Sequence, residues 1–538
     1  MGFSTKAIER QKRLLYDRNI WLAILSFALP SIVLGLMTGL FIFADQLMMV
    51  KFIPEHFTPE KLWGNELLTE YNKIRTDFAS VNLLVPDISE LVRTSVAYCA
   101  PVTIIINATA LLVGNGTAVN YNRYNGQKNF AMARKTWITG FWCNLFISLL
   151  LMVIICASCD AFIRFEQGNV ITNKINELQK LGWLDQHRLD VVRDFYTKYF
   201  NTVYTFSRQF IYTIGVGCVF AIFSSFITLL VIAEAKQMTV MMFAIICNVF
   251  NILLDFIFLR YAKMNTFAGG LATCCGWLLN LCMCFVYIWY LDKKKSTNLI
   301  LSDLKKFIFN FKEYWTLCKL GLCSFLRNIS IAVGTTLQVA LIISVTNKGA
   351  EFQSIYGAVN PIVTLLFTAA LSSTNGARTV SAYNYGAGNW QRVRSSYLCL
   401  SLIMIGWAIF VFLLCGVALN TQLLTLFSVR NLDDAKKVLM INLIVCLPVG
   451  LTVAAMMLFQ STNQWWKACI NGIMYGIICY IPIIFLAEYI AKTTNNPWLF
   501  ICAPIIIASI AAIICNIWSI IYLHKNCKTK KLQTNRHV

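Results

Sequence analysis

Charged residues are scarce in this chain. Of its 538 residues only 13% are Asp, Glu, Lys or Arg, whereas 58% are hydrophobic. A soluble domain carries roughly 25% charged residues, so this chain has too little charge to solubilise several water-facing domains. The composition therefore excludes a soluble enzyme, a secreted disulfide scaffold and a nucleic-acid-binding protein. It predicts an all-α polytopic membrane protein.

Histidine is rarer still, and cysteine is missing from the segments where disulfides would be expected. The four histidines lie in predicted loops or in the tail, which leaves no His metal site within the membrane. The 20 cysteines are scattered through apolar runs, and the long polar segments 51–95 and 160–202 contain none. An extracellular disulfide framework is thus not indicated. We expect no catalytic residue, no His or Cys metal site and no bound cofactor.

Acidic residues are fewer than basic ones, and the positive excess is unevenly distributed. The net charge is +21. The N-terminus, every second loop and the C-terminal tail together carry +20, the intervening loops carry +1, and the apolar runs carry none of it. Cytoplasmic loops of membrane proteins hold an excess of Lys and Arg. We therefore predict a multi-pass protein of the cell (plasma) membrane with both termini in the cytoplasm, rather than a nucleic-acid partner.

Long apolar runs are abundant. A helix needs about 20 apolar residues to cross the bilayer core, and twelve runs meet this length. They lie at residues 21–50, 96–120, 137–159, 203–232, 238–259, 268–291, 314–345, 352–377, 397–418, 438–461, 467–488 and 499–523. The first run contains Pro30, which removes a backbone hydrogen bond and predicts a bend in that helix.

The two halves of the chain repeat each other. The segments after the second and eighth runs match at a constant offset of 260, and the identical pairs are Asn115 and Asn375, Gly116 and Gly376, Gly126 and Gly386, Asn129 and Asn389, and Arg134 and Arg394. Upstream the offset is 293 and downstream it is 227, so it falls by 33 at each of the segments 51–95 and 160–202. Each segment is thus an insertion into one copy of a duplicated six-helix unit. Parallel repeats of this kind are typical of transporters that handle substrate between the halves.

This duplication predicts twelve transmembrane helices in two pseudo-symmetric six-helix lobes. The predicted parts are an N-lobe at 1–291 with helices 1–6 and the two outer insertions, a cytoplasmic linker at 292–313, a C-lobe at 314–524 with helices 7–12, and a basic cytoplasmic tail at 525–538.

Two acids lie deep inside apolar runs, Asp45 in the first and Asp255 in the fifth. A carboxylate at mid-membrane is costly and usually faces a cavity in which it works. Asn251 and Asn248 precede Asp255 by four and seven residues, so the three side chains share one helix face. Such a group can hold a proton or a Na⁺ ion. The structural alternative is that each acid stabilises a bend or joins neighbouring helices.

One arginine, Arg327, lies about a dozen residues inside the seventh run, too deep for its side chain to reach the interface easily. It either lines a cavity, held by backbone carbonyls or water, or it contacts an anion, because a guanidinium matches the geometry of a phosphate. Arg327 and Asn248 are therefore the candidate residues of a substrate cavity.

These elements resemble the multidrug and toxic compound extrusion (MATE) transporters. The resembling stretches are Ala28-Leu29-Pro30 with Asp45 fifteen residues on, Val113-Gly114-Asn115-Gly116-Thr117, Asn251-Ile252-Leu253-Leu254-Asp255 with Ala268-Gly269-Gly270-Leu271-Ala272-Thr273, and Tyr383-Asn384-Tyr385-Gly386-Ala387-Gly388-Asn389. The resemblance covers nearly all of the chain outside the two insertions and the tail.

The resemblance implies a central cavity between the lobes and a cation or proton site in the N-lobe. Asp45, Asn251 and Asp255 match the residues of that site, with Thr273 on the sixth helix as a weaker addition, and Na⁺ is then a possible ligand of the first three. Another branch of the family carries acids on helices 7 and 10, where this chain has Arg327 and neutral residues. This departure favours coupling in the N-lobe.

The function expected first is that of a secondary-active multidrug exporter. It would return H⁺ or Na⁺ inward by antiport and expel small amphipathic compounds by alternating access, as a monomer in the lipid bilayer. The alternative is a flippase for a lipid-linked anionic precursor, with Arg327 contacting its phosphate. A membrane-embedded enzyme is disfavoured because no constellation of His, Ser or Cys accompanies the two acids.

Overall fold

The computed structural model describes residues 5–78, 83–167, 170–181, 185–306, 311–346, 349–426 and 431–534. These residues are almost entirely helical, and no strand occurs among them. Twelve of their helices are long and apolar enough to cross a membrane. The predicted all-α membrane fold is thereby confirmed.

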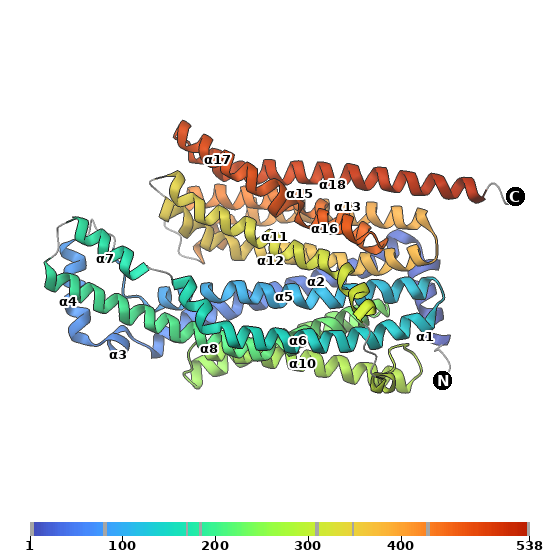
Figure 1. Ribbon diagram of the computed structural model, residues 1–538, viewed down its shortest axis with the longest axis horizontal. Helices are drawn as coiled ribbons and strands as arrows, with labels where there is room; N and C mark the ends of the chain where they lie inside the picture. Colours follow the sequence, from blue (N-terminus) through green and yellow to red (C-terminus); the bar gives the residue numbers. More distant parts are fainter. Residues whose placement is uncertain are drawn as a thin grey trace.

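The twelve spans form two neighbouring lobes of six (Figure 1). The N-lobe spans are α2 (Ile20–His56), α5 (Ile88–Gly126), α6 (Phe130–Gln167), α8 (Gln186–Ala233), α9 (Gln237–Phe256) with the π turn η3 (Ile257–Tyr261), and α10 (Thr266–Lys293). The C-lobe spans are α11 (Phe311–Val345), α12 (Gly349–Gly386), α13 (Trp390–Val411) with η5 (Phe412–Ala418), α15 (Leu432–Ser461), α16 (Trp465–Ile473) with η6 (Met474–Cys479) and α17 (Tyr480–Thr494), and α18 (Pro497–Thr534). The short helix α14 (Asn420–Thr425) precedes α15.

Short polar side chains directly before several spans explain where those helices begin. The side chain of Asn19 accepts a hydrogen bond from the backbone N–H of Trp21, and that of Asn265 accepts one from Phe267, both at 3.0 Å. A first-turn N–H has no partner within the helix, so an Asn or Asp cap stabilises the start. The same kind of cap is made for α5, α13 and α15 by Asp87, Asn389 and Asn431.

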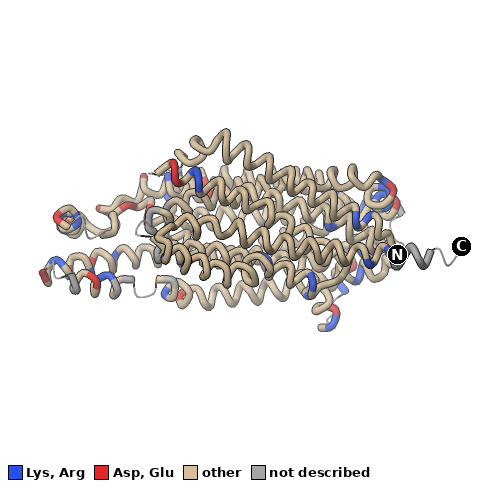
Figure 2. The backbone as a smooth tube through the Cα atoms, turned by 90° about the horizontal axis from the view of Figure 1, so that it is seen from above, with Lys and Arg blue, Asp and Glu red and all other residues tan. Residues whose placement is uncertain are grey.

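Both chain termini lie at one end of the bundle, the termini side, together with α1 (Thr5–Lys12) and the π turn η1 (Arg13–Asp17) (Figure 1). The opposite end, the cap side, carries α3 (Pro59–Trp63), α4 (Asn65–Asp77) and α7 (Val170–Leu181). Charged residues gather at these two ends, and the length between them is mostly uncharged (Figure 2). A membrane-spanning bundle requires this distribution.

The two insertions are largely helical, where the sequence predicts outer loops. Helix α2 continues to His56, and α8 begins at Gln186 and has 48 residues. At 1.5 Å per residue α8 is about 72 Å long, more than twice the roughly 30 Å of the bilayer core. Its extension packs against α4, where Tyr71 stacks on Phe195 with 3.8 Å between ring centroids. The insertions therefore form a folded cap that continues the core of the N-lobe.

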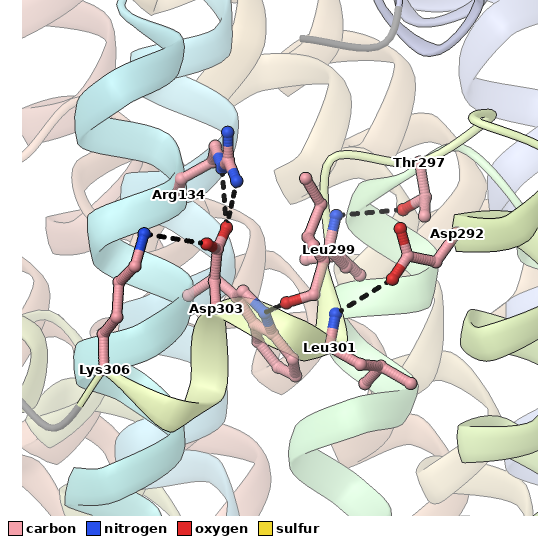
Figure 3. A network of polar contacts seen from close by, with 9 residues as sticks. Arg134, Asp292, Thr297, Leu299, Leu301, Asp303 and Lys306 are labelled. Carbon is pink, nitrogen blue, oxygen red and sulfur yellow. Dashed lines mark hydrogen bonds and ion pairs between the residues drawn. The ribbon is translucent and has the colours of Figure 1, made fainter. Parts of the chain in front are cut away.

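The segment predicted as the linker is held against α6 by a polar network (Figure 3). Asp303 in the short helix η4 (Leu301–Lys305) accepts hydrogen bonds from Arg134 Nε at 2.9 Å and from Lys306 Nζ at 3.2 Å. The Asp292 carboxylate accepts a further bond from the backbone N–H of Leu301 at 3.2 Å. These contacts order the connection between the two lobes.

Replacing Asp303 by Asn should weaken this connection in a pH-dependent way. Burial raises the pKa of the Asp303 carboxyl, but the hydrogen bonds and charges of Arg134 and Lys306 outweigh this effect and hold the pKa below its ordinary value. A group with a lowered pKa stabilises the fold at neutral pH, and that stabilisation is lost as the pH falls through the folded-state pKa. We expect Asp303→Asn to cost about 1.5–3 kcal/mol of unfolding free energy at pH 7.

The measurement is thermal unfolding in detergent at pH 7 and pH 3, with Asp190→Asn as the control. Asp190 forms an exposed ion pair with Arg193, so its replacement should change stability by no more than about 0.5 kcal/mol. A difference between Asp303→Asn and wild type that is the same at both pH values would contradict the expectation.

Candidate functional site

The four residues predicted for the coupling site come from three helices that pack together. Helix α9 lies against both α2 and α10. It contributes Asn251 and Asp255, while α2 contributes Asp45 and α10 contributes Thr273. All four side chains are buried, and the Asp45 and Asp255 carboxylates lie close enough to repel each other. The structure therefore places the four residues on three helices that pack together, and their role in coupling stays a prediction.

Two glycines of α10 make this close approach possible. A Cβ atom at Gly269 would lie 2.9 Å from Asp45 Oδ1 and 2.7 Å from Met49 Sδ. A Cβ atom at Gly276 would lie 3.3 Å from the Cβ of Asn251. Thr273 is one turn from each glycine, on the same face of α10. The small residues thus let α10 press directly against the acidic and amide side chains.

Most polar atoms of this cluster have no hydrogen-bond partner within the described part of the chain. The partnerless atoms are Asp45 Oδ1, both carboxylate oxygens of Asp255, both amide atoms of Asn251, and Thr273 Oγ1. A buried polar atom without a partner is costly, and two neighbouring carboxylates add repulsion. A proton or a hard cation would relieve both costs, because carboxylate, amide and hydroxyl oxygens are the ligands that such cations prefer.

We expect a methyl group at Gly269 to disturb this cluster selectively. In Gly269→Ala the new Cβ forces Asp45 or Met49 to move, and crowding of this kind typically costs about 1–3 kcal/mol. Thermal stability, and any dependence of that stability on Na⁺ or H⁺ concentration, should therefore both change. The matched control is Gly406→Ala on α13, where an added Cβ meets no atom within 4 Å. If the response of stability to Na⁺ or H⁺ is the same in Gly269→Ala as in the wild type, α10 does not contribute to ion binding.

Two further N-lobe residues, Asn248 and Pro30, also have predicted roles. Asn248 lies on the same face of α9 as Asn251 but is only half-buried. Pro30 is buried within α2, which is continuous from Ile20 to His56. The bend at Pro30 and the substrate contact of Asn248 stay predictions.

Two arginine side chains of the C-lobe, Arg327 and Arg378, are buried. Arg327 in α11 is only 6% exposed, and its Nη2 donates to Asn328 Oδ1 at 3.2 Å. Arg378 in α12 is 3% exposed, and its Nη1 donates to Asn115 Oδ1 at 2.6 Å and Asn375 Oδ1 at 2.8 Å. The same Asn115 side chain donates through Nδ2 to Ser324 Oγ at 3.0 Å, and Ser324 lies one turn before Arg327 on α11, so both arginines belong to the surroundings of Asn115.

Arg378 escaped the sequence prediction because the eighth span was predicted to end at residue 377. Helix α12 instead continues to Gly386, so Arg378 lies about two turns inside it. One signal was available: at the offset of 260 its counterpart is Ala118. A charge in one copy of a repeat and an apolar residue in the other marks a position where the copies differ in role.

The lobes meet on the termini side in a reciprocal contact between α5 and α12. A Cβ atom at Gly126 would lie 2.1 Å from the carbonyl oxygen of Tyr383, and one at Gly386 would lie 2.1 Å from that of Arg123. The offset of 260 relates Gly126 to Gly386 and also Arg123 to Tyr383. The contact is therefore repeated by the pseudo-symmetry of the two lobes, and any side chain larger than glycine would separate them.

A second backbone contact joins α5 to α11. A Cβ atom at Gly321 would lie 1.5 Å from the Leu112 carbonyl oxygen, and one at Gly116 would lie 2.0 Å from that of Leu317. Beside this contact is a cavity of about 10 Å³ lined by both lobes, including Asn115 and Arg378. It has room for about one water molecule. The described parts of the two lobes thus meet in close backbone contact on the termini side.

The N-terminal segment reinforces this contact by bonding to both lobes. Gln11 Nε2 donates to the Ala233 carbonyl at 3.3 Å in the N-lobe. In the C-lobe, Asn384 Nδ2 donates to the Leu15 carbonyl at 2.9 Å, and Arg392 donates to the Arg18 carbonyl at 2.8 Å. Separation of the lobes at this end therefore requires these bonds to break.

Comparison with known proteins identifies the same architecture. The MatE family profile matches residues 78–181 and 328–486, which fall in both lobes. An uncharacterized MG447 homologue of Mycoplasmoides gallisepticum is 27% identical and covers 95% of this chain and 90% of its own length. The uncharacterized MG447 homologue of Mycoplasma pneumoniae is 22% identical over 94% of this chain and 92% of its own length.

Solved structures match the whole fold. An outward-facing multidrug resistance MATE family transporter of the MOP superfamily superposes with a TM-score of 0.75 at 14% identity, over 98% of this chain and all of the other. A MOP superfamily transporter of Pyrococcus furiosus, described as having a binding pocket of reverse polarity that suggests a different function, gives a TM-score of 0.73 at 15% identity over 98% and 99% of the chains. Together with the profile matches in both lobes, these structures show that the chain is a multi-pass membrane protein with the fold of the MATE family transporters.

Proposed function

We propose that this transporter is a secondary-active exporter, not an enzyme, driven by inward flow of H⁺ or Na⁺. The observation that supports it is the buried cluster of Asp45, Asn251, Asp255 and Thr273, whose oxygen atoms lack partners until a cation or proton arrives. A site that binds one ion within the membrane-spanning segments can be exposed to either side in turn as the lobes rock.

The proposed orientation places the termini side in the cytoplasm of the cell membrane. The charge distribution supports it, since the segments at that end carry +20 and those at the opposite end carry +1. In this orientation the end at which the lobes meet faces the cytoplasm, and the folded cap lies outside the cell.

Two classes of transported substrate are considered. The first is small amphipathic compounds, and the similarity of the fold to a multidrug resistance MATE family transporter favours it. The second is an anionic molecule such as a lipid-linked precursor, and the buried positive charges of Arg327 and Arg378 favour it specifically. A permanent positive charge repels organic cations and attracts phosphates or carboxylates.

The proposal is tested with purified protein in liposomes under separately imposed pH and Na⁺ gradients. Efflux of a fluorescent amphipathic dye driven by one gradient identifies both the direction and the coupling ion. Absence of gradient-driven movement of either an amphipathic dye or a lipid-linked phosphate would contradict secondary-active export.

A further inference from the structure

Arg327 and Arg378 carry buried positive charge without compensation. Both guanidinium groups lie within membrane-spanning helices, and the Nε atom of each has no hydrogen-bond partner among the described residues. Neither guanidinium forms an ion pair with a described carboxylate, and each has only neutral amide oxygens as side-chain hydrogen-bond acceptors. A buried charge is costly unless an opposite charge accompanies it.

We propose that Arg327 and Arg378 form a binding site for an oxyanion, a phosphate or carboxylate group carried by the transported substrate. This inference rests on the proposed transport function and assigns its substrate class. A guanidinium presents parallel N–H donors in a fixed plane, which match two oxygens of a phosphate or carboxylate. Two such groups near the same Asn115 side chain supply more than one pair of donors to a single anion.

The position of Asn115 links this site to the movement of the lobes. Arg327, Arg378 and Asn375 belong to the C-lobe, whereas Asn115 belongs to the N-lobe. In the closed arrangement Asn115 Oδ1 accepts a bond from Arg378 Nη1, and the adjacent cavity holds only about one water. When the lobes part on the termini side, Asn115 withdraws and the Nη1 donor becomes free for an oxyanion.

Anion binding and closure therefore compete for the same donor of Arg378. The site binds the anion tightly while the termini side is open, and its hold weakens when closure returns Asn115 to Arg378. A ligand shifts a conformational equilibrium only through such a difference in affinity. An exporter with this competition binds its anionic substrate more tightly while the termini side is open than after that side closes.

The test is equilibrium binding to the full chain in nanodiscs, with no ion gradient. One arm titrates inorganic phosphate against sodium chloride of equal ionic strength. The other compares nanodiscs of phosphatidylcholine with and without phosphatidic acid, using thermal stability as the readout. We expect Arg327→Gln and Arg378→Gln each to weaken the phosphate response by roughly thirtyfold or more, as loss of one partner of a buried charged pair does. Arg208→Gln is the control, because Arg208 is exposed and already paired with Asp160.

Asn115→Ala tests the same idea in the opposite direction. It removes the amide that competes for Arg378, so binding should tighten by roughly tenfold, the equivalent of one charged hydrogen bond. A response to free phosphate, or to phosphatidic acid alone, would support the site and would identify the source of the oxyanion.

No response of the wild type in either arm would overturn the proposal, as would equal responses in wild type and both Arg variants, or unchanged binding in Asn115→Ala. Binding needs no gradient, so its failure leaves ion-coupled export standing, and loss of coupling at Asp255 leaves this binding intact.

Discussion

Replacing Asp255 by Asn should abolish gradient-driven transport while the protein still inserts and folds. Asn keeps the size and polarity of the side chain but removes the titratable charge. Asp255 is fully buried beside Asp45, and neither of its carboxylate oxygens has a partner within the described residues. We expect the affinity for the coupling ion to fall by about 10–100-fold, the loss typical when a supporting group is removed from a metal site.

The same replacement should leave the stability of the protein unchanged or raise it, because it relieves the repulsion between two carboxylates. Efflux from liposomes under pH and Na⁺ gradients measures the coupling, and thermal unfolding measures the stability. Asp45→Asn should behave like Asp255→Asn, whereas Asp160→Asn, at an exposed ion pair, should transport normally. Full gradient-driven efflux in both buried variants would locate the coupling elsewhere.

Gly321→Ala should force the termini side open. The new Cβ would lie 1.5 Å from the Leu112 carbonyl oxygen, a backbone atom that cannot turn aside, so α5 and α11 must separate. We expect the closed arrangement to lose about 3 kcal/mol or more, at the upper end of the cost of overpacking. The population with open termini side should rise accordingly.

A native pair of cysteines reports this opening. Cys143 of α6 and Cys318 of α11 lie on different lobes, with 3.8 Å between their sulfur atoms. In a background that lacks the other cysteines, oxidation should join the two lobes, so that cleavage at a protease site inserted in the linker leaves them on one band. Gly321→Ala should reduce this joined fraction and Gly406→Ala should not. Undiminished cross-linking in Gly321→Ala would mean that this contact does not close the interface.

Placing a charged residue in the bilayer core costs free energy, which explains why much of the candidate site was predictable. Apolar runs of spanning length predict the twelve helices, because lipid allows few alternatives to them. Asp45 and Asp255 stand out for the same reason, since a buried acid in such a run is rarely tolerated without a function. The sequence also shows the four-residue spacing between Asn251 and Asp255, whereas the meeting of three separate helices was predicted from the family resemblance.

Helix ends and folded extensions were harder to predict. The eighth predicted span ends at residue 377, just before Arg378, because hydropathy fades near the end of a span, although the helix itself continues by backbone hydrogen bonding to Gly386. The sequence predicts outer loops at 51–95 and 160–202 because the composition of these segments is polar. Their helices depend on cross-segment packing such as Tyr71 on Phe195, which no local window of sequence contains.

The sequence by itself determined the membrane class, the twelve spans, the duplication and the two intramembrane acids, because composition, run length and spacing are local properties. Only the tertiary structure decided that the lobes are in contact on the termini side, that Gly126 and Gly386 touch the opposite lobe, and that Arg378 bonds to Asn115. These features depend on distances of a few ångströms between helices far apart in the chain. Such distances follow from how the side chains of both lobes pack together, and no single segment specifies them.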